Sequence, residues 1–337
     1  RVFCSDKDAD GTKLDIISDK WIVYNNNTNI WYASDATQKR KTIRAEIKKY
    51  NPDILFINGI YSWYFNLIPL LFGSAAHKII STRGMLHPGA LSQKSLKKKW
   101  YLKIWHLFNF DKGCTFHASD EDEKKYILQV FGNNRPVDIA ANFPRVLPCA
   151  TMPEKKWGTL TLVSIALISA MKNHLMVLQA LKNCAQQIVY NIYGPVKDES
   201  YWQKCLEQIQ ELPDNIQVNY PGDINPLKVA AVLKEAHVFI LPSKSENYGH
   251  AIIEALFSGR PVITSNNTPW NNLQDEHAGI NVNPEDISQL TDSIAHFAIM
   301  SNTELQEWRV AANRYAGNKV HISSIKQQYR QMFALNS

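Results

Sequence analysis

Short apolar or β-branched runs alternate along the chain with segments whose apolar residues recur at helical spacing. In the first half, a run at 1–5 predicts a strand, as do runs at 53–58, 78–82, 114–118 and 137–141. The segments between these runs predict helices at about 39–50, 62–72, 92–109 and 119–131. The second half repeats the rhythm, with predicted strands at 160–165, 188–193, 216–220, 237–241, 261–264 and 279–282. Such alternation is typical of βαβ units, so we expect parallel sheets with helices on both faces.

The two halves of this pattern predict two doubly wound α/β domains, at residues 1–148 and 149–319. They join near 142–157, where three prolines interrupt the periodicity. Residues 320–337 predict a separate amphipathic helix, because their apolar residues recur at helical spacing after the second sheet is complete. Since residues 1–5 already have the pattern of a strand, we expect the first strand of the first domain to be missing.

Composition agrees with two globular domains. A chain of 337 residues corresponds to about two domains of roughly 150 residues each. Its 45% hydrophobic and 20% charged residues exclude a disordered or collagen-like chain. No apolar run approaches the roughly 18 residues of a membrane span, which excludes an integral membrane protein. Five cysteines without a CxxC pair favour reduced thiols and a cytoplasmic protein.

Chemistry is concentrated after the predicted strand at 237–241. Glu246 lies in the loop that follows this strand, and Glu254 lies about one and a half turns into the next predicted helix. Carboxylates in these positions can accept hydrogen bonds from vicinal hydroxyl groups. The backbone N–H groups of the residues between them suit a phosphate or a sugar oxygen.

The spacing Glu246-x7-Glu254, with Asn-Tyr-Gly-His inside it, resembles the EX7E signature of family-4 retaining glycosyltransferases. The resemblance continues through Gly-Arg-Pro-Val-Ile-Thr at 259–264, back to Ser-Ala-Met-Lys-Asn at 169–173, and to Arg-Gly-Met-Leu-His-Pro at 83–88. It implies the GT-B fold, in which two doubly wound Rossmann-like domains face a cleft and the C-terminal helix crosses back to the first domain.

The resemblance also implies a nucleoside-diphosphate-sugar donor held in the second domain. Glu254 is implied to bind the ribose hydroxyls, and Glu246 to hold the sugar hydroxyls together with the backbone of Asn247, Tyr248 and Gly249. An exposed loop acid and an ion pair on a helix face are the ordinary alternatives for these two acids.

Lys172 is implied to pair with the diphosphate at the N-terminus of its helix, where it would neutralise the leaving group. A solvated lysine is the alternative, although a cation at a helix N-terminus is unfavourable without an anion. Family members commonly carry an Arg five residues earlier, where this chain has Leu167. Arg83, after the predicted strand at 78–82, is expected to supply a second phosphate charge instead, a salt bridge or a cap being the alternative. Glu246, Lys172 and Arg83 are the predicted catalytic residues.

Three further positions are left open by the sequence. His87 is a candidate on the acceptor side or a loop histidine without a role. His250 either contacts the diphosphate or packs. Gly222 lies in a Tyr-Pro-Gly-Asp loop that resembles the loop bordering the nucleotide base. The family's glycine-rich loop of the first domain is not found, which agrees with a missing N-terminal strand.

The predicted helix at 92–109 combines lysines with Trp and Leu, a pattern typical of helices that lie on anionic membranes. The alternative is a core-packed helix with a solvated lysine face. The lysines are Lys94, Lys97, Lys98, Lys99 and Lys103.

No metal or other cofactor is expected. Asp6, Asp8 and Asp10 begin like an EF-hand loop, but Ile17 stands where that loop needs a Glu. Basic and aromatic residues do not interleave as in nucleic-acid-binding sheets, so nucleic-acid binding is not expected either.

The predicted function is that of a retaining glycosyltransferase, a hexosyl or glycosyl transfer enzyme. It would move sugar from a nucleoside-diphosphate-sugar to the hydroxyl of a glycan or lipid-linked saccharide in surface polysaccharide biosynthesis. We expect it in the cytoplasm, either free or peripherally bound at the inner face of the membrane. The alternative is a non-catalytic GT-B-fold protein that binds a nucleotide sugar or a partner; Leu167 supports it and Glu246, Glu254 and Lys172 argue against it.

Overall fold

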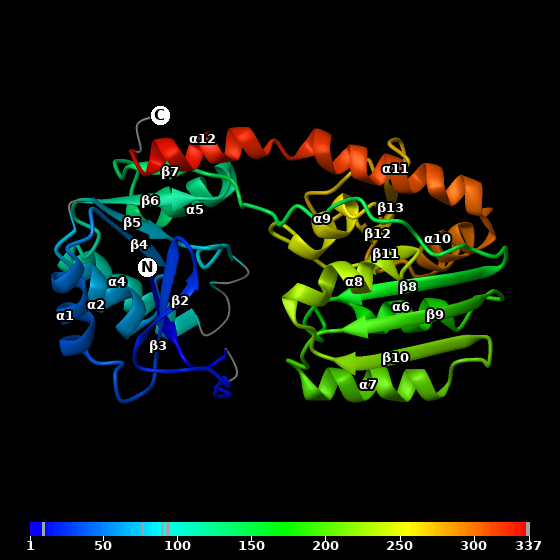
Figure 1. Ribbon diagram of the computed structural model, residues 1–337, viewed down its shortest axis with the longest axis horizontal. Coiled ribbons are helices and arrows are strands. Elements are labelled where there is room, and N and C mark those ends of the chain that lie inside the picture. Colours follow the sequence, from blue (N-terminus) through cyan, green and yellow to red (C-terminus); the bar gives the residue numbers. More distant parts are fainter. Residues whose placement is uncertain (9–10, 76, 89–90, 92–94, 335–337) are drawn as a thin grey trace. The chain divides into compact units, whose positions relative to one another are not determined.

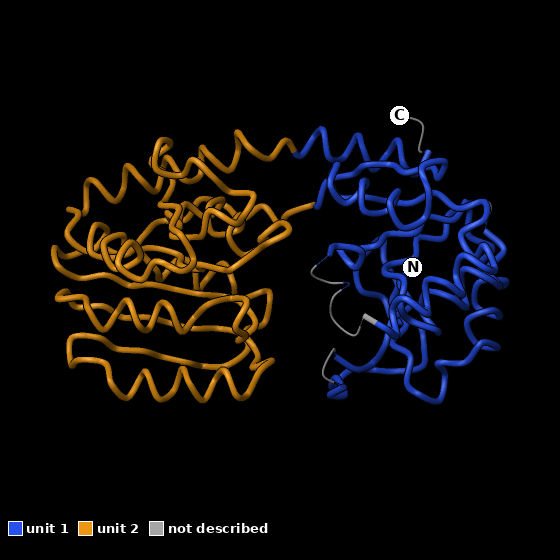
Figure 2. The backbone as a smooth tube through the Cα atoms, turned by 180° about the vertical axis from the view of Figure 1, so that it is seen from behind, with its two compact units in different colours: residues 1–142, 322–337 blue, residues 143–321 orange. Residues whose placement is uncertain are grey.

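The computed structural model contains two compact α/β units (Figure 1). Unit 1 comprises residues 1–142 and 322–337, and unit 2 comprises residues 143–321 (Figure 2). The residues that the structure describes are 1–8, 11–75, 77–88, 91 and 95–334.

A four-stranded parallel sheet in the order β4-β5-β6-β7 forms the centre of unit 1. Its register sets Ile57 beside Ile80 and Ile80 beside Phe116, all three buried. The strands confirm the four runs predicted from the sequence to within two residues. They are β4 (Ile54–Asn58), β5 (His77–Ser81), β6 (Cys114–Ala118) and β7 (Val137–Ile139).

A second sheet in unit 1 was not predicted. It has the order β1-β3-β2, in which β1 (Val2–Ser5) runs parallel to β3 (Thr28–Ala33). β2 (Trp21–Asn25) and β3 form an antiparallel hairpin. The sequence pattern was too weak to reveal the hairpin, because Val23 and Tyr24 are 79% and 67% exposed. The Asn-rich turn between the two strands is nevertheless a recognisable hairpin signal.

The helices of unit 1 occur where helical periodicity predicted them. α5 begins after Asp120, whose carboxylate accepts a hydrogen bond from the Glu123 N–H at 2.7 Å and so caps the helix. A π-helical turn at Trp63–Leu67 leads directly into α2. The helices are α1 (Arg40–Tyr50), α2 (Ile68–Phe72), α4 (Ser95–Phe108) and α5 (Glu121–Phe131).

Unit 2 is built on a six-stranded parallel sheet in the order β10-β9-β8-β11-β12-β13. The chain order therefore reverses between β8 and β11, which lie side by side with Val238 beside Leu162. All six predicted strands are confirmed. They are β8 (Thr159–Ile165), β9 (Gln187–Tyr193), β10 (Ile216–Gly222), β11 (Val238–Leu241), β12 (Val262–Ser265) and β13 (Gly279–Val282).

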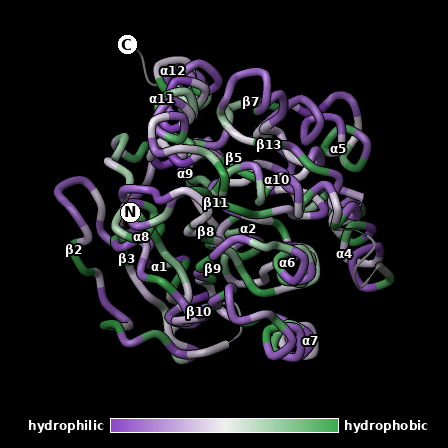
Figure 3. Tube along the Cα trace, turned by 90° about the vertical axis from the view of Figure 1, so that its right-hand side faces the viewer, coloured by the Kyte–Doolittle hydropathy of each residue, from purple (hydrophilic) through white to green (hydrophobic). Residues whose placement is uncertain are grey.

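Helices connect these strands; hydrophilic and hydrophobic residues alternate along α7 (Figure 3), whereas α6 and α9 are mostly apolar and buried. Such alternation lets one face of a helix pack on the sheet while the other faces water. The connecting elements are α6 (His174–Leu181), α7 (Glu199–Gln210), the 3₁₀ turn Pro226–Lys228, α8 (Val229–Lys234), α9 (His250–Phe257), α10 (Ile287–Ile299) and α11 (Asn302–Lys319).

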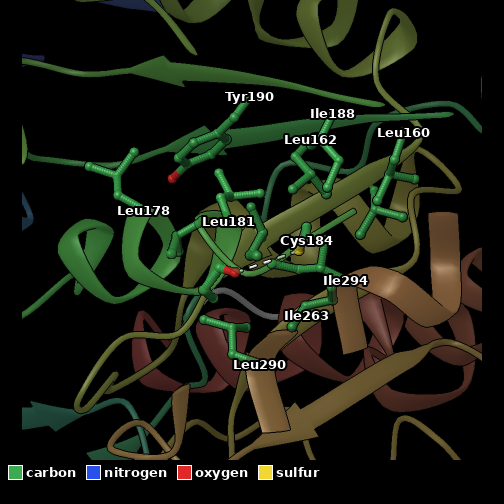
Figure 4. Packing of buried hydrophobic residues seen from close by; sticks show 14 of the residues in the cluster. Leu160, Leu162, Leu178, Leu181, Cys184, Ile188, Tyr190, Ile263, Leu290 and Ile294 are labelled. Carbon is green, nitrogen blue, oxygen red and sulfur yellow. Dashed lines mark hydrogen bonds between the residues drawn. The ribbon is translucent and has the colours of Figure 1, made fainter. Parts of the chain in front are cut away.

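The core of unit 2 lies between its sheet and the helices α6 and α10 (Figure 4). Leu162 of β8, Leu181 of α6 and Leu290 of α10 are completely buried there. Because parallel sheets bury both faces, their strands are continuously apolar rather than alternating, as Val-Phe-Ile-Leu of β11 illustrates. This rigid core holds the carboxyl ends of the strands in place.

The last helix, α12 (Ile322–Met332), returns to unit 1, as the GT-B resemblance implied. Its Gln328 side-chain oxygen accepts a hydrogen bond from the Ala141 N–H at 3.0 Å. Met332 packs with Ile79 and Ala140 in a small apolar cluster. Among the described residues, the structure has no helix with the length and apolar character needed to cross a membrane.

Lys155 provides a test of how unit 2 is held together. Its buried ammonium group donates hydrogen bonds to the carbonyl oxygens of Ala298 at 2.7 Å and Met300 at 2.6 Å, at the C-terminal end of α10. These carbonyls have no partner within the helix. We expect Lys155→Met to lower the free energy of unfolding by about 1–3 kcal/mol, because the Met300 carbonyl oxygen loses this donor and that of Ala298 keeps only the Gly158 N–H, at 3.0 Å. Urea denaturation measures this change.

The neighbouring Lys156 is exposed and is the matched control. Lys156→Met should change the free energy of unfolding by less than about 0.5 kcal/mol. Equal effects of the two substitutions would contradict the role assigned to Lys155.

Candidate functional site

The candidate residues of unit 2 follow the carboxyl ends of β8 and β11, the two strands between which the chain order reverses. Open parallel sheets bind ligands at such a reversal, beyond the carboxyl ends of the strands. The two loops touch, because the Lys244 N–H donates a hydrogen bond to the Met171 carbonyl oxygen at 2.9 Å. The fold therefore brings residues 166–173 and 242–249 together.

Lys172 and Glu246 form an ion pair across these loops, with 2.6 Å between Nζ and Oε1. Their side chains are only 23% and 10% exposed, so neither points into bulk water. The Ser243 hydroxyl donates a second hydrogen bond to the same carboxylate oxygen at 2.7 Å. Two predicted catalytic residues thus lie together, in a partly buried pair.

The residues between the two acids form a turn that ends at Gly249. Gly249 has φ +73°, and a Cβ there would lie 3.0 Å from Ile252 Cδ1 and 3.2 Å from Trp270 Nε1. Glycine is therefore required at this turn, both for its backbone conformation and for its lack of a side chain. The Tyr248 carbonyl oxygen accepts a hydrogen bond from the Trp270 indole N–H. Trp270, which sequence analysis did not identify, holds the turn in place through this hydrogen bond.

Asn247 is exposed in this turn, and His250 is the first residue of α9. The rings of Tyr248 and His250 are 4.7 Å apart and tilted by 50°. His250 is exposed as a whole. This ring contact, on a side chain that water also reaches, leaves open both alternatives from the sequence, packing and contact with the diphosphate.

Glu254 lies one turn into α9 and is partly buried. Burial raises the pKa of its carboxyl group, and the nearby Arg145 guanidinium acts in the opposite direction. Among the described residues, no side chain or backbone group donates a hydrogen bond to its carboxylate oxygens, which are not fully buried and which water still reaches. Glu254 therefore differs from Glu246, which already has two donors.

Arg145 was not identified from the sequence. It lies in the irregular segment before β8, and its Nη1 donates a hydrogen bond to the Pro226 carbonyl oxygen at 2.6 Å. An arginine in a segment without periodicity has no signal that distinguishes it from any other surface arginine. Only the fold places it near Glu254.

The loops after β9 and β10 complete this edge of the sheet. Gly194 follows β9, and a Cβ there would lie 1.9 Å from the Ala166 carbonyl oxygen, so the two loops can approach only with glycine. Its N–H donates to the carbonyl oxygen of Gly222, the last residue of β10, at 2.9 Å. Leu167, in the loop after β8, is 41% exposed and brings no charge to this edge.

In unit 1, Arg83 follows β5 and has the left-handed φ of 50°. Its Nε donates to the Asn58 side-chain oxygen at 3.0 Å, and its Nη1 donates to that of Asn142 at 3.1 Å. The guanidinium group is thereby held at the carboxyl ends of β4 and β5. His87 packs edge-on against Tyr126 of α5, with 5.4 Å between the ring centroids.

Glu123 fixes the conformation of the Arg83 loop. This buried carboxylate accepts hydrogen bonds from the Gly84 N–H and the Thr82 hydroxyl, both at 2.6 Å, and from the Ser119 N–H at 2.7 Å. Burial alone would raise its pKa, but these hydrogen bonds outweigh burial and hold the pKa of Glu123 below its usual range. Sequence analysis did not identify Glu123, which looks like one acid among several at the start of α5.

Residues 153–314 match the family model described as glycosyl transferases group 1. This segment covers nearly all of unit 2 and includes both acids and Lys172. The second unit of this chain belongs to the group 1 glycosyltransferase family.

Two curated relatives match the chain over shorter segments than the family model or over a similar length. The chain is 35% identical over 116 residues to the alpha-monoglucosyldiacylglycerol synthase of Streptococcus pneumoniae, over 34% of this chain and 26% of that protein. It is 26% identical over 160 residues to the 2-deoxystreptamine N-acetyl-D-glucosaminyltransferase of Niallia circulans, over 47% of this chain and 41% of that protein. The chain thus matches less than half the length of either relative.

Among solved structures, Anabaena HepE in complex with UDP and glucose superposes on 90% of this chain and 86% of its own, with a TM-score of 0.67 and 14% identity. This likeness extends over both units and confirms the predicted α/β fold of the GT-B type.

Glu123 allows a test of the Arg83 loop. A carboxyl group whose pKa is lowered in the folded state stabilises the protein above its unfolded pKa of about 4.5, and this contribution is lost as the pH falls through the folded pKa. We expect Glu123→Gln to lower the free energy of unfolding by about 1–3 kcal/mol at pH 7. The difference from the wild type should shrink when urea denaturation is repeated near pH 3.5.

The exposed Glu121, in the same helical turn, is the matched control. Glu121→Gln should have a small effect that is nearly the same at both pH values. A Glu123→Gln effect that does not change with pH would show that the carboxylate charge is not what holds the loop.

Proposed function

We propose that this chain transfers a sugar from a nucleoside-diphosphate-sugar to a hydroxyl group, with retention of the anomeric configuration. The observation that carries this proposal is the ion pair of Lys172 and Glu246 at the reversal point of the unit 2 sheet, with Glu254 in the helix that follows the same loop. A cation and two acids at this edge can hold a diphosphate and two sets of hydroxyl groups. UDP is the proposed nucleotide, since Anabaena HepE, which has the same fold, was solved with UDP and glucose.

In this proposal Glu254 binds the ribose. A ribose hydroxyl would donate to a partly buried carboxylate that has no hydrogen-bond donor among the residues that the structure describes, and so would relieve the cost of burying that charge. Arg145 lies close enough to favour the ionised form of Glu254. Gly222 and the loop that follows it would border the base.

Lys172 and Glu246 act on the diphosphate and on the transferred sugar. As the glycosidic bond to phosphate breaks, negative charge grows on the leaving diphosphate, and Lys172 would stabilise that charge. Glu246 keeps Lys172 oriented and would accept hydrogen bonds from sugar hydroxyls, as would the backbone of the turn Asn247, Tyr248 and Gly249. The departing phosphate oxygen would assist the incoming hydroxyl on the same face of the sugar. Arg83 is the proposed source of the second phosphate charge that Leu167 does not supply.

The proposed acceptor is a glycan or a lipid-linked saccharide of surface polysaccharide biosynthesis, and the proposed location is the cytoplasm. The two relatives, an alpha-monoglucosyldiacylglycerol synthase and a 2-deoxystreptamine N-acetyl-D-glucosaminyltransferase, support sugar transfer but differ in their acceptors. His87 is the acceptor-side candidate. A protein that binds the donor without transferring sugar is the alternative, which Leu167 supports.

Release of UDP from UDP-sugars tests the assignment of Glu254. We expect Glu254→Gln to lower kcat/KM for the donor roughly 10- to 100-fold, because a hydrogen bond to a charged group contributes about 1.5–3 kcal/mol. Glu207, exposed on α7, is the control, and Glu207→Gln should leave the rate unchanged. Equal rates for both variants would place the ribose elsewhere. Donor binding without any UDP release by the wild type would favour the alternative.

Lys172 should affect the chemical step more than donor binding. We expect Lys172→Met to lower kcat roughly 100- to 1,000-fold, as losses of transition-state charge stabilisation do, with a smaller change in KM. Lys234, exposed in the same unit, is the control for loss of one positive charge. A change confined to KM would mean that Lys172 binds the ground state only.

A further inference from the structure

Helix α4 of unit 1 is apolar on two opposite faces. Its inner face packs into the core of unit 1 through Tyr101, Leu102 and Trp105, the last being 1% exposed. Its outer face carries Leu96, Trp100 and Leu107, which are 74%, 65% and 75% exposed. At 3.6 residues per turn, positions 96, 100, 103 and 107 fall on one side of a helix. A helix that only covers a core needs apolar residues on one face.

Lysines surround the outer apolar face. Lys97, Lys99 and Lys103 are exposed, and the Lys103 ammonium lies 5.2 Å from the centroid of the Trp100 ring. The helix sequence Ser-Leu-Lys-Lys-Lys-Trp-Tyr-Leu-Lys-Ile-Trp-His-Leu-Phe contains no acidic residue. We therefore expect a positive potential over an exposed apolar ridge.

Of the five lysines that the sequence analysis assigned to a membrane-facing side of this helix, not all lie on its outer face. Lys98 is half-buried, with its ammonium 5.3 Å from the centroid of the Tyr61 ring, so it belongs to the inner side of α4. Lys94 lies outside the described residues. The surface that the structure supports consists of Leu96, Trp100 and Leu107 with Lys97, Lys99 and Lys103, and we name it the α4 ridge.

Helix α1 of the same unit is basic and solvated but lacks the exposed apolar residues of α4. Lys41, Arg44 and Lys48 are exposed on α1, but no large apolar side chain of α1 is exposed. Charge alone therefore does not explain the α4 ridge. A second copy of this chain is a poor partner for the ridge, because pairing two ridges would bring six lysines of like charge together.

We propose that the α4 ridge docks on an anionic membrane surface. Leu96, Trp100 and Leu107 enter the boundary between head groups and acyl chains, where the indole ring of a Trp is favoured. The three lysines lie at the level of the lipid phosphates, and attraction to anionic lipids adds to the burial of apolar area. This docking is independent of sugar transfer, and its test needs no donor.

Sedimentation with lipid vesicles tests the proposal on the whole chain. We expect the wild type to bind vesicles of phosphatidylcholine with about 30% phosphatidylglycerol, and to bind phosphatidylcholine alone at least tenfold more weakly. Lys97→Gln/Lys99→Gln/Lys103→Gln should weaken binding to the anionic vesicles about tenfold or more, since each lysine near the surface contributes. Trp100→Gln/Leu107→Gln should weaken it similarly. Because the chain has nine tryptophans, the blue shift of total tryptophan fluorescence on binding is compared between the wild type and this variant, which should lose most of it.

The control Lys41→Gln/Arg44→Gln/Lys48→Gln removes the same charge from α1 and should change binding less than threefold. Circular dichroism of each variant checks that it is folded, and we expect every variant to be folded because the substituted side chains are exposed. Two outcomes would overturn the proposal: no binding of the wild type to anionic vesicles, or equal weakening by the α4 and α1 lysine variants. UDP release by the same preparations is scored separately, so a failed membrane assay leaves the transferase proposal intact.

Discussion

The reversal of strand order between β8 and β11 is the constraint on which the candidate site depends. Parallel strands end at the same edge of a sheet, and here the two strands at the reversal are neighbours, with Phe239 beside Val163. Their following loops must therefore leave the sheet side by side and lead into α6 and α9. A shift of register by one residue would turn buried residues of β11 toward the opposite face and move Glu246 with them. The large apolar core beneath the sheet makes such a shift costly.

We propose that the ion pair of Lys172 and Glu246 serves ligand binding more than the stability of the fold. A partly buried ion pair gains attraction but loses hydration, and the two effects nearly cancel in many proteins. This pair is nevertheless supported by the Ser243 hydroxyl and by contact between the two loops. These contacts hold the Lys172 ammonium group in one orientation even without a ligand. An arriving diphosphate would then meet an oriented cation rather than one that must first be ordered.

The sequence predicted the parallel sheets well and the side chains that act through loops less well. Strands such as β11 are recognisable because a sheet buried on both faces needs unbroken apolar runs. The hairpin of β2 and β3 was not predicted, because some of its residues are exposed and polar residues interrupt its apolar pattern. Glu246 and Glu254 could be found because their spacing is local in sequence. Arg145 and Glu123 could not, because their importance comes from contacts to residues far away in the chain.

Glu254 has a partly buried carboxylate and the α4 ridge has exposed apolar side chains, and the two features belong to different units. The Glu254 carboxylate is partly buried with a raised pKa, so hydroxyl donors would improve its surroundings. The α4 ridge exposes apolar area beside lysines, so an apolar phase with negative charge would improve its surroundings. Neither feature disturbs the packing of the two hydrophobic cores, because Glu254 and the residues of the α4 ridge are not part of them. We propose that both features are binding surfaces, with a sugar nucleotide as the ligand of unit 2 and an anionic membrane as the partner of unit 1.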